Sequence, residues 1–334
     1  MRLIRRWLPA VVAVLATVAI VVTAPRESPA ETTVQRAIGH QQLRIMAPAS
    51  PGGGWDQTSR AMQEALREIV GRTEVYNVSG AGGTIGLSQF VRFDGDPSQL
   101  MTTGLIMVGA VVANRSQYSL DDTTPLVRLT SDYEVVVVPK ASPMTKLSDV
   151  AAAMKADLPA VSISGGSAGG AEQILAGLMA QAIGADPAGL SYVAHSGGGE
   201  MLSTLLSGRS TIAISGVSEI QPQIDTGEVR ALAVSSPERL PGLPDVPTMR
   251  EAGMDVELEN WRGVVAPKGI TDEQEAALEE LLLDMTKTQT WQDILKDRGW
   301  GDATLAGEPF ERFVQAEQAR VKQVLDDMGL GKSN

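Results

Sequence analysis

Cysteine is absent from this chain of 334 residues, and histidine occurs only at positions 40 and 195. Without cysteine the protein has no disulfide, no thiolate nucleophile and no thiol for lipid attachment. Two histidines so far apart also argue against a zinc site, and we expect neither a metal nor another cofactor. Aromatic residues make up only 4% of the chain. This disfavours a sugar receptor, which usually stacks aromatic rings on its ligand.

Basic residues are also scarce, since the whole chain has a formal net charge of −12. Residues 1–30 hold four arginines and one glutamate, and without them 24 basic residues stand against 39 acidic ones, a net charge of −15. This balance argues against nucleic acid as a partner, because binding to phosphates needs a basic surface. It does not exclude a small anion, because charges beyond a Debye length of roughly 8 Å are screened.

A long apolar run occurs only in the first 30 residues. Three arginines among the first six residues precede the apolar run Trp7–Ala24, and the small residues Ser28-Pro29-Ala30 follow. This order is typical of a secretory signal peptide cleaved after Ala30. The run of 18 residues just reaches spanning length, so an uncleaved membrane anchor is the alternative. We expect an exported protein, in the periplasm or at the outer face of the cytoplasmic membrane.

The rest of the chain repeats one arrangement: a short apolar strand, a turn rich in glycine or serine, and a helix. The six strands are LRIMAP, EVYNVS, QLMTTG, VSIS, LSYVAH and TIAIS. Short apolar runs that alternate with longer helical periods predict an α/β protein with parallel strands. The capping box of Thr271 and Gln274 predicts a helix start near the C-terminal end.

The six units fall into two blocks that two further strands connect. The polar stretch SQYSLDDTTPL ends the first block, DYEVVVVPKAS opens the second, and SPERLPGLPDVPT follows it. After the strand ELENWRGVVAP we expect helices only. The predicted lobes are residues 31–127 with 237–334, and residues 128–236. Because ligands bind beyond the carboxyl ends of parallel strands, the glycine turns of both lobes should face one cleft.

Four stretches carry a family resemblance: LRIMAPASPGGGWDQTSRAMQEAL, VYNVSGAGGTIGLSQF, VSISGGSAGGAEQ and GEVRALAVSSPERLPGLPDVPTMREAGMDVELENWRGVVAP. Together they resemble the solute receptors of the tripartite tricarboxylate transporters, also called Bug receptors. The resemblance implies a two-lobed periplasmic-binding-protein fold of type II with two hinge-crossing strands. It implies a monomeric receptor, not an enzyme, with an organic carboxylate anion in its cleft and a membrane permease as partner. GGGWD and NWRGVVAP favour a citrate-like tricarboxylate, while dicarboxylates and aromatic acids stay open.

In such receptors the glycine loops of the first lobe hold a carboxylate, and loops of the second lobe select the rest of the ligand. Carried over to this chain, the resemblance makes the following residues the candidate substrate-binding residues: Pro51, Gly52, Gly53, Gly54, Trp55, Asp56, Ser79, Gly80, Ala81, Gly82, Gly83, Gly165, Gly166, Ser167, Gly169, His195, Ser196, Gly197, Gly198, Ser215 and Ser218. One departure is the turn Ser215–Ser218, where many relatives carry an acidic or amide residue. This departure leaves the identity of the ligand open.

The glycine turns have a physical reason to bind an anion. Backbone N–H groups at a helix start lack intrahelical partners and carry about half a positive charge together. Gly52–Gly54 and Gly80–Gly83 each precede a predicted helix, so each offers such a site. The alternative is that these glycines only turn the chain tightly. Asp56 and Arg60 have the spacing of an ion pair within a helix, and Asp56 can instead hold a loop amide.

Single aromatic and basic residues allow two interpretations each. Trp55 is either a wall of the binding site or part of the core. Trp261 and Arg262 lie in a predicted strand, and we interpret both as structural. His195 ends a strand directly before a glycine turn, which makes it either a ligand contact or a structural residue.

Two enzyme classes compete with the receptor. GGSAG at residues 165–169 matches the nucleophile elbow of a secreted α/β serine hydrolase that would use Ser167. Asp186 and His195 follow after only 19 and 28 residues, although such enzymes usually take their histidine from near the C-terminus. GAGGTIG resembles a dinucleotide-binding turn, but its glycine spacing is G-x-G-x-x-x-G. The receptor is therefore our prediction, and the hydrolase is its alternative.

Overall fold

The computed structural model describes residues 32–195 and 198–331. The predicted signal peptide lies outside these ranges, as do the predicted site residues Ser196 and Gly197. Within the described ranges, no helix combines the length and the apolar character needed to cross a membrane.

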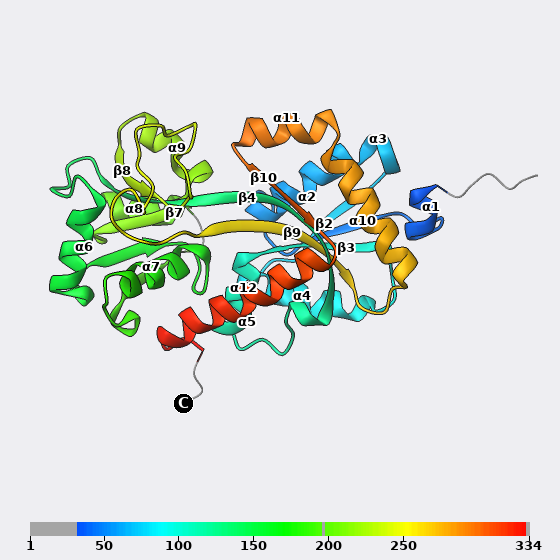
Figure 1. Cartoon of the computed structure of the whole chain (residues 1–334), viewed down its shortest axis with the longest axis horizontal. Helices are drawn as coiled ribbons and strands as arrows, with labels where there is room; N and C mark the ends of the chain where they lie inside the picture. Colours follow the sequence, from blue (N-terminus) through cyan, green and yellow to red (C-terminus); the bar gives the residue numbers. More distant parts are fainter. Residues whose placement is uncertain (1–31, 196–197, 332–334) are drawn as a thin grey trace, which may run out of the picture. The chain divides into compact units, whose positions relative to one another are not determined.

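Ten strands form one connected, hydrogen-bonded system (Figure 1). They are β1 (Arg44–Ala47), β2 (Glu74–Asn77), β3 (Gln99–Gly104), β4 (Thr123–Pro139), β5 (Ser162–Gly165), β6 (Ser191–Ala194), β7 (Ile212–Gly216), β8 (Val229–Val234), β9 (Glu259–Pro267) and β10 (Gly301–Ala306). In the first lobe β1 is parallel to β2 and β3, and β9 is antiparallel to β3 and β4. In the second lobe β5 is parallel to β6 and β7, and β4 is antiparallel to β7 and β8.

The long strand β4 crosses from one lobe to the other. Its residues up to Tyr133 pair with β9 or β10, whereas those from Glu134 onward pair with β7 and β8. β9 is the second crossing strand and returns the chain to the first lobe. Each lobe thus shows the strand order second, first, third and crossing strand, which is the two-lobed fold of type II that the sequence predicts.

Two features of the sheet differ from the sequence prediction. β4 begins at Thr123, inside the stretch that we expected to be a polar transition. Pro125 is tolerated there because the pairing with β9 shifts register between Pro125 and Val127. The strand β10 was not expected at all. It pairs only with β4, in an irregular register, and its short sequence GDATLA carries little hydrophobic signal.

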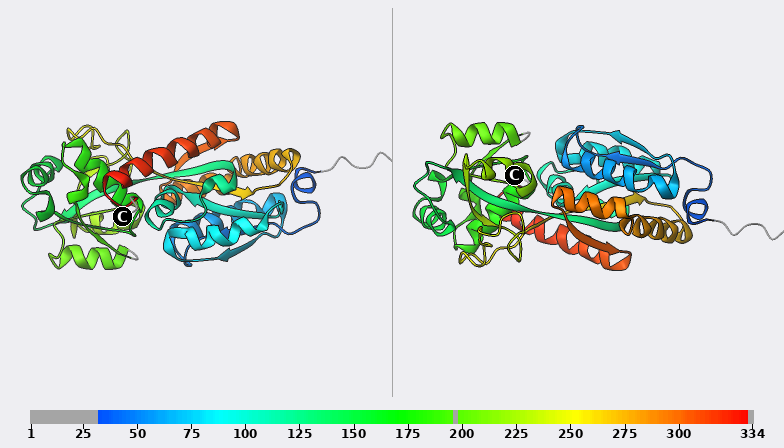
Figure 2. Two further views of the ribbon diagram at one scale, coloured as in Figure 1. Left: turned by 90° about the horizontal axis from the view of Figure 1, so that it is seen from below. Right: turned by 90° about the horizontal axis from the view of Figure 1, so that it is seen from above.

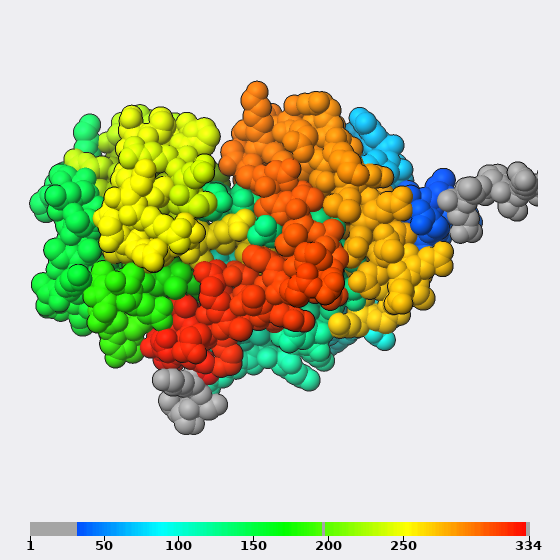
Figure 3. Space-filling view, in the orientation of Figure 1, coloured from blue at the N-terminus to red at the C-terminus, as the bar shows by residue number. Residues whose placement is uncertain are grey.

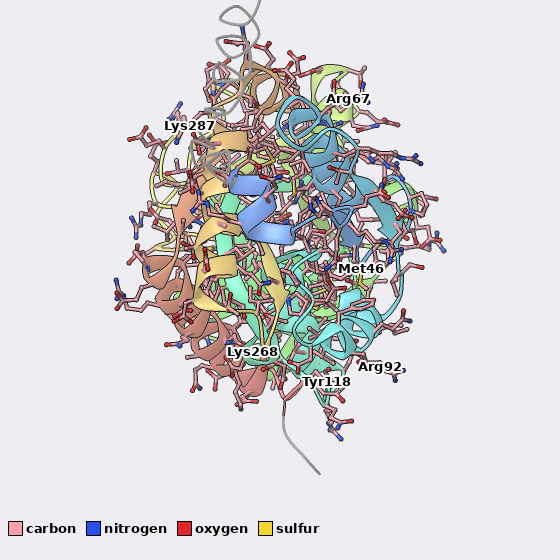
Figure 4. The ribbon with its side chains drawn as sticks, turned by 90° about the vertical axis from the view of Figure 1, so that its right-hand side faces the viewer. Met46, Arg67, Arg92, Tyr118, Lys268 and Lys287 are labelled. Carbon is pink, nitrogen blue, oxygen red and sulfur yellow. The ribbon has the colours of Figure 1, made fainter. Side chains whose placement is uncertain are left out.

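Twelve α-helices cover the sheet in the described part of the chain. They are α1 (Thr33–Ile38), α2 (Gly54–Ala65), α3 (Arg67–Val70), α4 (Thr84–Phe90), α5 (Leu105–Ala113), α6 (Leu147–Ala156), α7 (Ala171–Ala182), α8 (Gly198–Leu206), α9 (Val217–Asp225), α10 (Asp272–Thr286), α11 (Gln289–Arg298) and α12 (Glu308–Asp327). The predicted capping box at Thr271 and Gln274 is confirmed at the start of α10. Helix α1 packs on α10 (Figure 4). Arg36 of α1 pairs with Glu280 of α10 at 2.8 Å.

Helix α12 packs on both lobes. It contacts α5 of the first lobe and α7 of the second, and Figure 2 shows it running along the molecule from one lobe to the other. A side chain at Gly177 of α7 would meet Val324 and Met328 at the end of α12. The close approach of α12 to α7 therefore depends on a residue without a side chain.

The segment between β8 and β9 packs on the second lobe. Leu240, Leu243 and Val246 join a core cluster with Val135 and Val137 of β4. The N–H of Leu258 donates to the carbonyl of Ser235 at 3.1 Å. The division at 127/128 and 236/237 stays a prediction. From the pairing and packing we propose that the second lobe extends from Glu134 to Leu258.

The core of the first lobe includes the apolar face of α10. Leu278, Leu281, Leu282 and Met285 are fully buried in one cluster, as their helical spacing indicates. The neighbouring Leu283 on the same helix is only partly buried.

We predict that Leu281→Ala lowers the free energy of unfolding by about 2–5 kcal/mol, because it removes fully buried methyl groups and leaves a cavity. Leu283→Ala, the same chemical change on the same helix, should cost less. Urea unfolding followed by circular dichroism measures both. An equal loss in the two variants would show that the face assigned to the core is wrong.

Candidate functional site

A cavity of about 560 Å³ lies between the two lobes. In Figure 3 the surface is hollowed between the yellow-green atoms around α9 and the orange atoms of α11. The lining comprises Gly52, Gly53, Gly54, Gln57 and Ile106 from the first lobe, and Gly166, Ser167, Glu172, His195, Gly198, Gly199, Met201, Leu202, Ile214, Ser215, Glu219, Ile220 and Gln223 from the second. Helices α2, α5, α7, α8 and α9 each contribute residues from or just before their first turns. The cavity therefore lies beyond the carboxyl ends of the strands that precede these helices.

The first-lobe wall is the turn that leads into α2. Gly52 has a φ of +85°, a conformation that glycine adopts without strain. Gly53 is the residue before the helix, and no side chain caps the helix start. A side chain at Gly54 would come within 3.0 Å of the Arg262 guanidinium. These residues leave backbone N–H groups of α2 open to the cavity, which is the arrangement that receives an anion.

Asp56 lies behind this turn and holds it in place. Its carboxylate accepts hydrogen bonds from the Gly52 N–H at 2.8 Å, from Asn77 at 2.8 Å and from Arg60 at 3.0 Å. Burial alone would raise the pKa of Asp56, but these hydrogen bonds hold it below its ordinary value. The predicted ion pair with Arg60 is present, and so is the bond to a loop amide. Asp56 thus positions the turn from outside the cavity.

The second glycine turn, Ser79–Gly83, packs away from the cavity. A side chain at Gly83 would collide with Trp55 and Met107, and one at Gly82 would collide with Ala110 of α5. These glycines therefore permit close packing of the turn against the first lobe. Trp55 itself is buried in the core.

Eight of the predicted site residues line the cavity, namely Gly52, Gly53, Gly54, Gly166, Ser167, His195, Gly198 and Ser215. The described residues that lie outside its lining are Pro51, Trp55, Asp56, Ser79, Gly80, Ala81, Gly82, Gly83, Gly165, Gly169 and Ser218. The lining residues that we did not predict include Gln57, Ile106, Glu172, Met201, Glu219 and Gln223. Most of these follow a glycine turn within about two helical turns. They would have been predicted if the candidate residues had included the first two turns of the helix after each glycine turn.

Glu172 is the first carboxyl group in the wall of the second lobe. It lies in the first turn of α7 and packs under the preceding loop, because a side chain at Gly166 or Gly170 would come within 3.0 Å of its carboxylate. Burial raises the pKa of Glu172 to about 7, and the charge of Glu219 adds to this rise. Hydrogen bonds from the backbone N–H groups of Glu172 itself and of Gly166 oppose it. Glu172 is therefore partly protonated near neutral pH.

Three further carboxyl groups surround Glu172. Glu219 lines the cavity from the first turn of α9, and its pKa is raised by its partial desolvation. Asp132 and Glu134 lie on β4 behind the cavity, and Asp132 accepts a hydrogen bond from Ser218 at 2.7 Å. Burial raises the pKa of Glu134 well above its ordinary value, and the charges of Glu172, Asp132 and Glu219 raise it further.

A buried cation lies beside this group of acids. Arg262 on β9 is buried, and its guanidinium lies 4.0 Å from a carboxylate oxygen of Asp132 and 3.4 Å from the Thr58 hydroxyl. Trp261, the residue before it, is fully buried and donates to Glu317 at 3.2 Å. Both side chains join elements of the structure, in agreement with their structural interpretation. In the described ranges, no group of three His, Asp or Glu residues is arranged to hold a metal ion.

The fold, with two crossing strands and a cavity between its lobes, is that of a periplasmic binding protein. The chain belongs to the tripartite tricarboxylate transporter family of receptors, whose model matches residues 58–330. It is 28% identical over 236 residues to Protein BugT of Bordetella pertussis, which covers 68% of this chain and 71% of that protein.

Two solved structures from Rhodopseudomonas palustris are similar to the chain. Rpa4515 with adipate is 25% identical, with a TM-score of 0.74, covering 86% of this chain and 97% of that one. MatC with bound malate is 25% identical, with a TM-score of 0.69, covering 86% and 98%. The family consists of periplasmic solute receptors and not of enzymes. The chain is therefore a receptor, and the serine hydrolase alternative is excluded.

The raised pKa of Glu172 makes stability depend on pH. The folded state binds this proton more tightly than the unfolded state, so stability falls as pH rises from about 4.5 to about 7. We predict that Glu172→Gln removes part of this fall. The melting temperature of the variant relative to that of the wild type should therefore rise between pH 5 and pH 8. Glu228→Gln, at an exposed position, should follow the wild type. If the melting temperatures of Glu172→Gln and the wild type differ by the same amount at every pH, the raised pKa of Glu172 is contradicted.

Proposed function

We propose that this receptor binds an organic carboxylate in the cavity between its lobes and delivers it to a tripartite tricarboxylate transporter permease. The uncapped start of α2 at the wall of the cavity is the observation that carries the proposal. The cavity volume of about 560 Å³ lies within the range of small-molecule sites. The related structures with malate and adipate support a carboxylate ligand.

The ligand, the export and the oligomeric state are further parts of the proposal. A citrate-like tricarboxylate stays a prediction from the sequence, and dicarboxylates belong beside it in any screen. We propose that residues 1–30 direct export and are removed after Ala30, and that the mature receptor is a monomer. The periplasmic location of the family supports this proposal.

Residues 31–334 should be stabilised by their ligand. A ligand at 100 times its dissociation constant adds about 2.7 kcal/mol to the free energy of unfolding. We expect at least one carboxylate from a thermal-shift screen of citrate, malate, succinate, glutarate, adipate and their amino-substituted analogues to raise the melting temperature. Neutral sugars serve as controls. If no carboxylate in the screen raises it, the proposed function is wrong.

Gly53→Val should weaken carboxylate binding at least tenfold and leave the fold intact. The φ of −69° at Gly53 suits any residue, and a Cβ there comes within 3.1 Å of the Ser50 carbonyl oxygen. A branched side chain would lie at the open amides of α2. Gly189→Val is a matched control, because Gly189 lies outside the cavity and a Cβ there meets only Leu158, at 3.5 Å. Isothermal titration calorimetry with the carboxylate found in the screen measures both. Unchanged affinity in Gly53→Val would show that this turn only reverses the chain.

A further inference from the structure

The cavity has different chemistry at its two ends. The first-lobe end offers backbone N–H groups at the start of α2, which are hydrogen-bond donors. The second-lobe end carries the carboxyl groups of Glu172 and Glu219, which in ionised form only accept hydrogen bonds. Between the two ends lie apolar side chains, namely Ile106, Met201, Leu202, Ile214 and Ile220.

No lysine or arginine is among the described residues that line the cavity. Arg262 lies behind it and is already beside Asp132. Asp132, Glu219 and Glu134 thus share one guanidinium, and Glu172 adds a fourth carboxyl group beside Glu134. A ligand that is anionic at both ends would bring its second carboxylate toward this excess of like charge.

Two buried polar atoms at this end lack a partner in the described part of the chain. Glu134 is only 1% exposed, and while its Oε1 accepts from Asn260 at 3.1 Å, its Oε2 has no hydrogen bond. The pairing of β4 with β7 places Glu134 opposite Gly216, directly before the helix that carries Glu219. The Nε2 atom of His195, in the cavity lining, is also buried without a partner. A buried polar atom without a partner is costly. Of these two atoms, the Nε2 of His195 belongs to the cavity lining, where a polar group of a ligand can reach it.

Helix stabilisation does not account for this arrangement. An acid in the first turn of a helix gains about 0.3–1 kcal/mol from the helix dipole, which favours its charged form. Glu172 and Glu219 occupy such positions, yet burial and neighbouring acids favour their neutral forms. Burial and the neighbouring acids therefore act against the stabilisation of the charged forms by the helix dipole. Such perturbed carboxyl groups are typical of ligand-binding and active sites.

We propose, on the basis of the proposed function, that the ligand is an aliphatic amino carboxylate. Its carboxylate lies at the start of α2, and its ammonium group lies between Glu172 and Glu219. An ammonium group supplies both the positive charge and the hydrogen-bond donors that this end lacks. The ligand class is then organic acids that also carry an amine, and not organic acids in general.

Matched ligand pairs test this proposal by calorimetry at pH 7.5. The pairs are succinate with aspartate, glutarate with glutamate, glutarate with 5-aminopentanoate, and adipate with 6-aminohexanoate. We expect at least one amino member to bind ten times or more tighter than its dicarboxylate. If dicarboxylates bind and no amino member is tighter, the inference is overturned and the proposed function stands. If neither the members of these pairs nor citrate nor malate bind, the proposed function itself fails, and the inference with it.

The variants Glu172→Gln and Glu219→Gln test whether these two carboxyl groups bind the ammonium group. Each should weaken binding of the preferred amino ligand at least tenfold and leave dicarboxylate binding equal or stronger. Asp225→Asn, on α9 with Glu219 but outside the cavity lining, is the matched control and should change neither. Equal weakening of both ligand types by the glutamine variants would indicate general damage to the cavity and overturn the assignment.

The direction of the pH dependence gives a second readout. Glu219 on α9, Glu134 on β4 and Tyr192 on β6 lie near Glu172, and His195 lines the same cavity. Asp132 on β4 and Arg262 on β9 act on Glu134 and Glu219. Between pH 5.5 and pH 8, ionisation of Glu172 should strengthen amine binding and weaken dicarboxylate binding. Amine binding that weakens over this interval would contradict the proposed contact.

Discussion

Two crossing strands determine where charge is buried in this receptor. β4 changes its partners between Tyr133 and Glu134, and β9 returns beside it. As a result, Asp132, Glu134 and Arg262 meet between the lobes, away from bulk water. Charges in such a place are costly unless they are paired. With one guanidinium beside Asp132, Glu134 and Glu219, the pairing is incomplete, and burial together with the like charges raises the pKa values of Glu134, Glu172 and Glu219.

The same architecture directs the starts of several helices to one cavity, but the side chains near these helix starts differ between the two lobes. In the first lobe, the Asp56 carboxylate accepts a hydrogen bond from the Gly52 N–H and so holds the glycine turn in place. No side chain caps the start of α2. In the second lobe, Glu172 and Glu219 occupy the first turns of α7 and α9 and line the cavity. The first wall therefore offers hydrogen-bond donors, and the second adds two carboxyl groups. A ligand that spans the cavity must match both walls.

Local patterns predicted most of the architecture. Apolar strands followed by glycine turns correctly indicated β1, β2, β3, β5, β6 and β7, because alternation and turn chemistry act over a few residues. The capping box at Thr271 and the pair of Asp56 with Arg60 follow from spacing within one helical turn. The strand β10 and the early start of β4 escaped prediction, because both depend on pairing between distant segments.

The amino-acid sequence by itself determined the order of strands, turns and helices and the family to which the chain belongs. It also predicted glycine turns at the cleft. Only the tertiary structure decided which turns reach the cavity: Gly52–Gly54 does, while Ser79–Gly83 packs against Trp55 and α5. It also decided that Glu134, Glu172 and Glu219, far apart in the chain, share one partly desolvated region. Desolvation and charge repulsion depend on distances in space, and no local pattern of residues encodes them.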